Sequence, residues 1–567
     1  MSLSPRTFLI VSLCTAPVIA VACGGNGTES TSSTGGSSST TGSGGKASGT
    51  GSGNGGGLFT TGSGGGVPQG PFSDFPKDPV LDGEVPADVA TLFGPAGSGD
   101  PSGGPCLFEP ETDTLFPRNW LRPRFRWNAG AGQNLFELRL HTAAQTDDLV
   151  VYTAGSSWTM PKEMWKALAA HPAGVPITMT VRGARYENGA LVGAVSVGTS
   201  GPMTVAPAEA EGAIVYWTTS GASALKGFSA GDETVVTALL PGQVKMKTAN
   251  NAAVTCIGCH TSTPDGKFAG FTGQSPWGNA LGSVTAATVG DAPPFLGAGA
   301  TATLAQYGDL GIQTYSKAHW SAGDHVMVTP FGSGNASNLA WIDLEAAENE
   351  MGKSYGYLAR NGDSRGAGAP TWSHDGKTVV YVSTDAEFTG RLDNGDADLY
   401  AVPYNNRQGG DAKPIPGASD PSLEEYYPAF SPDDALLAFN RIPNGNNMYD
   451  QPLGEVFVIP SAGGTATRIA ANDPPACVGK TSPGVTNSWP KWAPGTTTAG
   501  GKKYYWLIFS SKRNPKGNPQ LYITGIVVDG ANVETHGALY LWNQPEGENN
   551  HTPAWDFFDI PPTPPPT

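Results

Sequence analysis

The chain has 567 residues, of which 33 are basic and 49 are acidic, so its formal net charge at pH 7 is −16. This charge disfavours a nucleic-acid partner, because binding to phosphates requires a basic surface. Glycine (78 residues) and proline (48 residues) are abundant. Both are poor helix formers that are common in turns, so the composition favours many short strands. Beyond the first 22 positions no apolar stretch is long enough to cross a membrane, which excludes a polytopic membrane protein.

Residues 1–22 have the pattern of an export signal. Arg6 gives a positive start, an apolar run follows, and the small residues 20–22 precede Cys23. This pattern resembles the lipobox of bacterial lipoproteins. The resemblance implies that the thiol of Cys23 is acylated and that Cys23 becomes the mature N-terminus. The alternative is an ordinary signal peptide followed by an incidental cysteine.

Residues 23–66 are predicted to be a disordered tether. They consist almost wholly of Gly, Ser and Thr, which cannot bury enough apolar surface to fold. A flexible chain of this length spans about 35–40 Å, enough to hold a folded body away from a membrane. Gly24 stands where inner-membrane lipoproteins of well-studied Gram-negative systems carry Asp. We therefore expect a lipid anchor in the cell envelope, at the outer membrane.

Two folded units are expected after a linker at 67–104. Residues 105–207 contain short alternating segments, of which 136–141 is the cleanest. Short strands separated by turns are typical of a small β-sandwich. The stretch loosely resembles a fibronectin-type domain, and nothing in it looks catalytic.

Residues 208–562 contain an internal repeat. One copy begins Pro-Thr-Trp-Ser-His-Asp-Gly-Lys at Pro370 and is followed by an apolar run, and Pro428 begins a second copy. The aromatic residues of successive copies are 52 to 63 residues apart, the length of a four-stranded propeller blade with long loops; they lie at positions 320, 372, 430, 492 and 555. As a set these motifs resemble TolB-like β-propellers, a family related to WD-repeat proteins.

The resemblance implies an all-β fold with six blades, or alternatively seven. Segments 213–217 and 234–239 look like outer strands without an inner strand, and 553–558 looks like an inner strand without outer ones. Together they predict one shared blade that closes the ring and leaves no free sheet edge. Residues 563–567 form a Pro-rich tail.

One motif carries recognisable chemistry, because residues 256–260 read Cys-Ile-Gly-Cys-His. CxxCH is the attachment signature of c-type haem, in which two thiols bind the porphyrin and the histidine binds iron. We therefore predict haem attachment at Cys256 and Cys259, with His260 as the proximal iron ligand. The alternatives are a local disulfide, a redox dithiol or half of a zinc site, and no second Cys/His pair supports zinc. No helical cytochrome module surrounds the motif, which argues against haem.

The repeat places His260 where Pro370 stands in its own copy, at the start of an inner strand. A distal iron ligand would come from a neighbouring blade, and the candidates are His551 and His319. Two further cysteines, Cys106 and Cys477, lie 371 residues apart. Export to an oxidising compartment permits a disulfide between them, although the sequence alone does not show that they meet.

The sequence supports three classes of function. The first is a haem lipoprotein that acts in electron transfer or haem-linked sensing with an unidentified redox partner. The alternative is a non-enzymatic propeller that binds an envelope protein without haem. A hydrolase or lyase is the third class, but there is no GxSxG, HExxH or Walker motif, so a non-catalytic role is favoured.

Overall fold

A computed structural model describes residues 70–171, 174–221, 223–247, 251–273, 278–305, 312–331, 337–385 and 396–561. The expected export signal, Cys23, the tether and the Pro-rich tail lie outside the described residues. The described part of the chain is mostly β, with short helices between some of the strands. None of the helices in these ranges is long and apolar enough to span a membrane.

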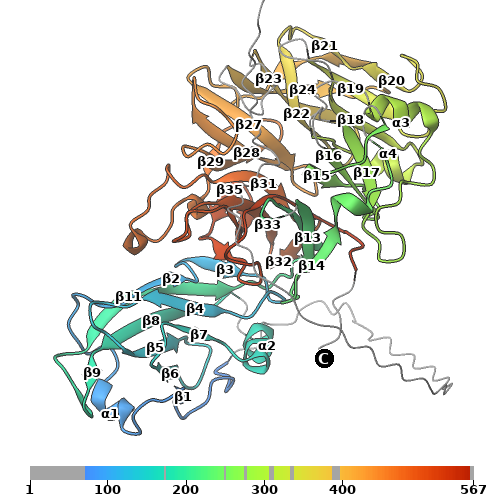
Figure 1. Ribbon diagram of the computed structural model, residues 1–567. Helices are drawn as coiled ribbons and strands as arrows, with labels where there is room; N and C mark the ends of the chain where they lie inside the picture. The colour runs from blue at the N-terminus through green and yellow to red at the C-terminus, as the bar shows by residue number, and fades with distance from the viewer. Residues whose placement is uncertain are drawn as a thin grey trace, which may run out of the picture.

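The N-terminal unit contains two larger sheets that share one core, and a two-stranded sheet formed by β9 and β10. One sheet has the strand order β1-β6-β5-β8-β11-β3 and the other has the order β2-β4-β7. Two short helices, α1 and α2, accompany them (Figure 1). The elements are β1 (Val80–Asp82), α1 (Val89–Phe93), β2 (Cys106–Glu109), β3 (Thr114–Phe116), β4 (Arg124–Asn128), β5 (Leu135–His141), β6 (Leu149–Thr153), β7 (Ser157–Thr159), α2 (Lys162–Ala170), β8 (Pro176–Ala184), β9 (Tyr186–Glu187), β10 (Ala190–Leu191) and β11 (Ser196–Val205).

Much of the segment that we predicted to be a linker, 67–104, belongs to this unit. β1 pairs in parallel with β6. The buried Arg182 bonds Glu137 and also donates to the backbone carbonyls of Phe93, Pro95 and Ser98. A guanidinium offers five donors, so one buried arginine can fix a segment that has little regular structure. The sequence of this segment has no periodicity, so its sequence alone predicts a linker.

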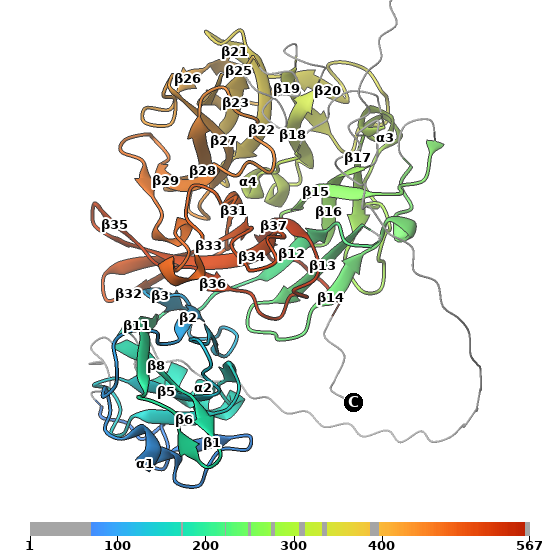
Figure 2. The same ribbon diagram turned by 60° about the vertical axis from the view of Figure 1, so that its left-hand side comes forward.

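From residue 213 onward the chain forms a series of small antiparallel sheets, an arrangement consistent with a propeller. Figure 2 shows them following one another in chain order, with the labels of β15, β31 and β37 near the middle. The sheets are β12 (Ala213–Thr218), β13 (Ala224–Ser229) and β14 (Val236–Leu239) with β37 (Asn550–Asp556); β15 (Ile257–Ser262), β16 (Phe268–Gly273) and β17 (Asn279–Ser283); β18 (Val326–Phe331), β19 (Asn338–Asp343) and β20 (Tyr355–Tyr357); β22 (Gly366–Trp372), β23 (Thr378–Thr384), β24 (Ala397–Pro403) and β26 (Lys413–Pro414); β27 (Leu423–Phe430), β28 (Leu436–Pro443), β29 (Glu455–Pro460) and β30 (Thr467–Arg468); and β31 (Ser488–Trp492), β33 (Lys502–Ser511), β34 (Gln520–Asp529) and β35 (Asn532–Thr535), with β32 (Thr497–Ala499) and β36 (Leu539–Tyr540) added to β33 and β34.

Smaller elements connect these sheets. β21 and β25 pair in parallel with each other. Helices α3 and α4 precede β18, so the copy of the repeat around Trp320 is helical where the sequence predicted an inner strand. The bounds are α3 (Ala298–Leu304), α4 (Lys317–Ser321), β21 (Ala359–Asn361) and β25 (Gly409–Asp411).

The repeated turn has the same hydrogen bonds in three sheets. A hydroxyl donates to the aspartate two residues later, and its oxygen accepts from the backbone N–H five residues later. In one copy Ser373 bonds Asp375 at 2.8 Å and Thr378 N at 3.0 Å. Such a side chain closes a tight turn by replacing backbone partners. Thr263 with Asp265 and Phe268, and Ser431 with Asp433 and Leu436, repeat the arrangement.

The end of the chain pairs with the beginning of the propeller region. β37 runs antiparallel to β12, with Ala213 opposite Asp556 and Thr218 opposite Asn550. The inner strand of this sheet therefore comes from the C-terminus and the outer ones from residues 213–239, as the sequence predicted. The pairing satisfies backbone groups that would otherwise face solvent at two strand edges.

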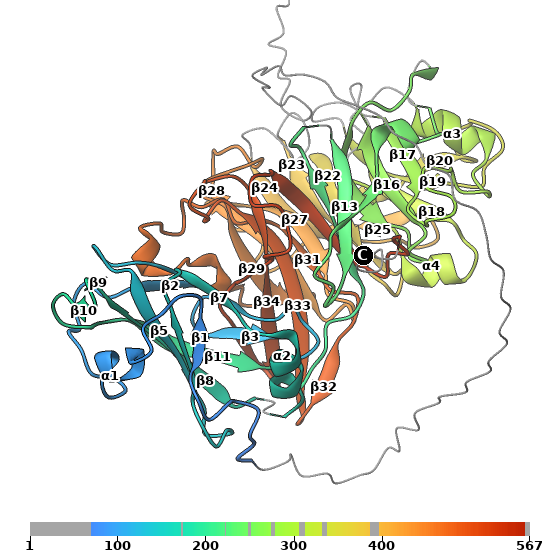
Figure 3. The ribbon, with the colours of Figure 1, turned by 60° about the horizontal axis from the view of Figure 1, so that its bottom comes forward.

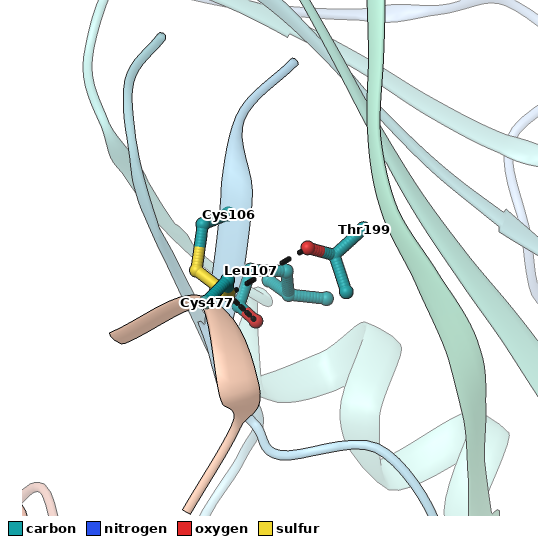
Figure 4. Close-up of a disulfide and its surroundings, with 4 residues drawn as sticks. All are labelled: Cys106, Leu107, Thr199 and Cys477. Atoms are coloured by element: carbon teal, nitrogen blue, oxygen red, sulfur yellow. Dashed lines mark hydrogen bonds between the residues drawn. A yellow bond between two sulfur atoms is a disulfide. The ribbon is translucent and has the colours of Figure 1, made fainter. Parts of the chain in front are cut away.

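The N-terminal unit packs against the last sheet (Figure 3). One apolar core includes Leu115 and Trp120 on one side and Ile508, Ile523 and Trp555 on the other. Within this contact Glu111 and Arg513 form a buried ion pair at 3.0 Å, and burial raises the pKa of Glu111. A disulfide joins Cys106 to Cys477, whose Cα atoms are 5.8 Å apart; Leu107 and Thr199 lie beside it (Figure 4). Apolar burial, an ion pair and a covalent bond therefore hold the two units together.

Candidate functional site

The inner strands share a β-bulge at one level. In β22 the pairs Ala367–Ser383 and Thr371–Val380 enclose one extra residue, and Ala369 adopts a positive φ. The residue after it is proline, which has no N–H to give to the ladder. β27, β31 and β37 repeat the bulge at Tyr427-Pro428, Trp489-Pro490 and Thr552-Pro553, with positive φ at the first residue of each pair.

The CxxCH motif lies on this bulge. In β15 the pairs Ile257–Gly273 and His260–Phe271 enclose the extra residue, so the bulge consists of Gly258 and Cys259. Counted back from the repeated turn, His260 has the position of Pro370, but it is paired in the ladder because the bulge of β15 lies one residue earlier than that of β22. The motif is part of a strand of the sheet, and not of the helical turn that surrounds it in small cytochromes.

The two cysteines belong to different apolar clusters. Cys256 is buried between sheets, in contact with the cluster of Val215, Trp217 and Ile257. Cys259 is half-buried and packs with the cluster that contains Tyr427 and Trp489. The Tyr427 and Trp489 rings stack with their centroids 3.7 Å apart. The two sulfur atoms thus do not face one common surface.

The imidazole of His260 is engaged inside the fold. Its side chain is buried, and Nε2 lies 3.1 Å from the carbonyl oxygen of Val215 on the neighbouring sheet. A carbonyl only accepts hydrogen bonds, so Nε2 carries the proton and has no lone pair for a metal. Nδ1 is also buried and has no well-aligned partner among the described residues. Burial lowers the pKa of His260 to about 4, which keeps the ring neutral at pH 7.

As the chain is folded here, these residues do not fit a covalent c-type haem. Attachment requires both thiols on one porphyrin and the histidine on its iron, whereas the thiols lie in separate clusters and Nε2 donates to Val215. No group of three potential metal ligands from His, Cys, Asp and Glu gathers anywhere in the described ranges. Of the motif's side chains, Cys256 is disulfide-bonded, Cys259 packs with an apolar cluster and His260 bonds the carbonyl of Val215.

The structure separates the two candidate distal ligands. His551, at the start of β37, has its ring 5.9 Å from Trp217, in the same region as Cys256. Burial lowers the pKa of His551 to about 4. His319 lies on α4, bonds Asp324 at 2.8 Å and contacts Trp372 and Tyr404. His319 therefore lies on a short helix, whereas the sequence predicted an inner strand at this position.

A polar cavity lies at the opposite, C-terminal end of the inner strands. Its volume is about 140 Å³, and residues from the inner segment of every sheet line it. One inner-strand residue from each of five sheets lines this cavity; it directly follows the bulge in β22, β27, β31 and β37, and in β15 it is the residue after His260. We call these residues the lumen positions: Thr261, Thr371, Ala429, Lys491 and Ala554.

Lys491 is the one charged residue among the lumen positions. It is half-buried, and its side chain forms no ion pair and no hydrogen bond among the described residues. Burial lowers the pKa of its ammonium from 10.5 to about 8, and a thiolate at Cys259 would oppose that shift. A titratable group whose pKa is displaced by burial in a cleft is a candidate for function.

Charged and aromatic residues surround the rim of the cavity. Asp556 is partly buried there, and burial raises its pKa to about 6. Lys317 is exposed, with Nζ 5.8 Å from the centre of the Phe557 ring. His374 lies across the rim, where its Nδ1 is 2.7 Å from Asp434. The cavity therefore presents cations both at its rim and in its interior.

Sequence reasoning missed Lys491, although a signal was present. Aligned copies of the repeat have Thr, Ala or Lys between the proline and the aromatic residue. A lysine in a column of small residues, inside a strand that must be buried, could have pointed to the lumen. The sequence alone does not show that this aligned position of the repeat lines the cavity.

Comparison with known proteins gives little further guidance. No protein-family model matches the chain, and no curated protein matches it. Solved structures with partial likeness include a nidogen/laminin complex (9% identity, 60% of this chain and 98% of that chain, TM-score 0.34). Others are the β-propeller domain of Cps50 (Swd1) from Myceliophteria thermophila (12%, 61% and 92%, 0.26) and the dihydro-heme d1 dehydrogenase NirN (10%, 65% and 72%, 0.25). At these TM-scores the likenesses carry no argument about function.

Proposed function

We propose that the protein is a lipid-anchored, non-enzymatic binding protein of the cell envelope. In this proposal residues 208–562 form a six-bladed propeller of the TolB-like kind, and a fibronectin-like sandwich precedes it. The central cavity receives a ligand that is bound and not converted. Six successive sheets and the pairing of β37 with β12 support the blade count.

The observation that carries this proposal is the lining of the central cavity. All the sheets contribute to it, and Lys491 brings to it an ammonium that has no ion pair and no hydrogen bond within the described ranges. A half-buried charge without a partner costs stability in the free protein. A bound ligand with a negatively charged group would supply the partner of the Lys491 ammonium and offset this cost.

The placement of the CxxCH motif supports this function over electron transfer. Haem-linked electron transfer remains the proposal that the motif alone would favour, because two thiols and a histidine stand at the right spacing. The contacts of these residues give that proposal no support, because Cys259 packs with a different apolar cluster from Cys256 and Nε2 of His260 is bonded to Val215.

The anchor is proposed from the sequence, and a single substitution tests it. Wild-type protein is expected to fractionate with membranes and to begin at an acylated Cys23. The Cys23→Ser variant is expected to be released or to remain unprocessed. If that variant is processed and stays membrane-bound like the wild type, the lipid anchor is wrong.

Mass spectrometry of the exported protein tests the binding function. The protein is extracted from its own envelope and weighed under native and then under denaturing conditions. We expect an added mass that denaturation removes. In Thr371→Phe, where a ring fills the lumen, the added mass should be lost, whereas Thr498→Phe on an exposed strand position should retain it. An added haem mass that survives denaturation would establish the haem function instead, and no added mass in the wild type would refute ligand binding.

A further inference from the structure

Lys491 reaches the lumen because of its place in the repeat. The residue after the proline lines the cavity in β22, β27, β31 and β37, and at the other lumen positions the side chains are only those of threonine and alanine. Lys491 is therefore the one lumen position that brings a charge to the cavity. Thr261 and Thr371 line the same cavity.

The charge balance of the cavity favours a ligand group with one negative charge. One ammonium in the interior compensates one charge, and no arginine side chain lines the cavity. Phosphate groups are usually held by arginine forks or by several donors. Asp556 at the rim would repel a dianion once it is ionised. A carboxylate satisfies these conditions, because it accepts hydrogen bonds from an ammonium and from hydroxyls.

The size of the cavity sets a second condition. A volume of about 140 Å³ admits a short, narrow group and not a whole drug-sized molecule. Phe557, which is 44% exposed, and Lys317 stand at the opening, where the remainder of a longer ligand would rest. The ligand therefore enters end-on, with its charged end toward Lys491.

From this geometry we infer that the central cavity binds a carboxylate at Lys491, with a small organic acid or the free C-terminus of a peptide as its source. The inference rests on the proposed binding function and specifies its ligand. The carboxylate accepts hydrogen bonds from Nζ of Lys491 and from the neighbouring threonine hydroxyls. The rim residues contact whatever follows the carboxylate.

Calorimetric titration of the full-length exported protein tests the inference. The probes are acetate, succinate, inorganic phosphate, and a short peptide with either a free or an amidated C-terminus. The variants are Lys491→Met, which removes the charge at similar length, and Lys491→Arg, which keeps it. Lys353→Met is the control. Lys353 is an exposed lysine that pairs with Glu348 and Glu350, and it does not line the cavity.

We expect at least one carboxylate probe to bind the wild type and the control equally. Lys491→Met should bind it about tenfold more weakly or worse, since a hydrogen bond to a charged group is lost. Lys491→Arg should retain part of the affinity. Preference for the free over the amidated peptide identifies a peptide terminus as the source, and equal or tighter binding of acetate or succinate identifies a small acid.

Three outcomes would overturn the inference. They are undiminished binding by Lys491→Met, tighter binding of phosphate than of every carboxylate, and no binding of any carboxylate probe by the wild type. These outcomes leave the native mass measurement unchanged. If the wild type carries a ligand that denaturation removes, the binding function stands and only the identity of the ligand changes. If the wild type carries no added mass, the binding function itself is refuted.

Discussion

Trp555 Nε1 donates a 2.8 Å hydrogen bond to the backbone carbonyl of Glu211, a residue 344 positions earlier in the chain. Trp555 lies on β37, and Glu211 precedes β12, the strand that pairs with it. The indole ring also belongs to the core that the N-terminal unit shares with the last sheet. One side chain thus connects the pairing of β37 with β12 to the packing of the two units.

A chain that ends at Asn549 is expected to lose far more stability than its length suggests. The deletion removes β37 and leaves β12 with an unpaired edge. Thermal unfolding should show a large fall in the midpoint or no cooperative transition. Trp555→Ala alone should cost about 3–5 kcal/mol. A chain that ends at Pro561 retains β37 and is the control; if the shorter chain melts with it, the closure has been misassigned.

Replacing both Cys106 and Cys477 by serine should destabilise the protein by about 2–5 kcal/mol, the usual effect of removing a native disulfide from a secreted domain. Denaturant unfolding of the double variant, compared with oxidised and reduced wild type, measures the effect. Reduced wild type should resemble the double variant. An unfolding midpoint that neither reduction nor substitution changes would contradict a structural disulfide.

Lys491→Met should stabilise the ligand-free protein near pH 7 by roughly 1–3 kcal/mol. The pKa of Lys491 is lowered from 10.5 to about 8, so between these values the unfolded chain holds more protons than the native one. Native stability therefore rises with pH across this window, and the advantage of the variant should vanish by about pH 10.5. Denaturation at pH 7 and pH 10.5 measures it, and an equal gain from Lys353→Met would argue against this cause.

Two neighbouring titratable groups, Cys259 and His260, interact electrostatically with Lys491 and affect this pH dependence. Cys259 is close enough for its thiolate to raise the pKa of Lys491, and Lys491 in turn lowers that of His260. The same denaturation measurement should therefore be repeated in the Cys259→Ser variant. In it the pKa of Lys491 should fall slightly further, and the stabilising effect of Lys491→Met should grow.

Acid should destabilise the protein through His260. Its pKa is about 4 in the native fold against an ordinary 6.5, so the unfolded chain binds more protons between these values. Stability should fall as pH drops through 6.5 toward 4. His551 acts in the same direction, so His260→Asn should remove only part of the slope. His141→Asn, on an exposed side chain, is the control. An unchanged slope in His260→Asn would show that the ring is not buried and neutral.

The repeat made much of the propeller region predictable, because its signals are local. The Ser373–Asp375 turn and the aromatic residue before it use hydrogen bonds within a few residues. The pairing of the C-terminus with β12 followed from counting strands. The incorporation of residues 80–104 could not be predicted, because it depends on Arg182, which lies more than 80 residues away.

The surroundings of the CxxCH motif could not be predicted from its spacing. The spacing is a property of the sequence, whereas haem attachment requires a backbone that turns both thiols toward one face. In an extended strand with a bulge, Cys256 and Cys259 belong to different clusters. Lys491 was not predicted for a related reason, because no motif marks it and only the strand register places it at the cavity.

The lumen positions are different from the residues that maintain the fold. Each lumen position contributes one side chain to the same small volume, while the prolines, aromatic residues and Ser-Asp turns beside it maintain the sheets. A single substitution at Thr261, Thr371, Ala429 or Ala554 can change the charge or the width of the cavity without altering a strand. Related chains with the same architecture could therefore select different ligands by exchanging only these few residues.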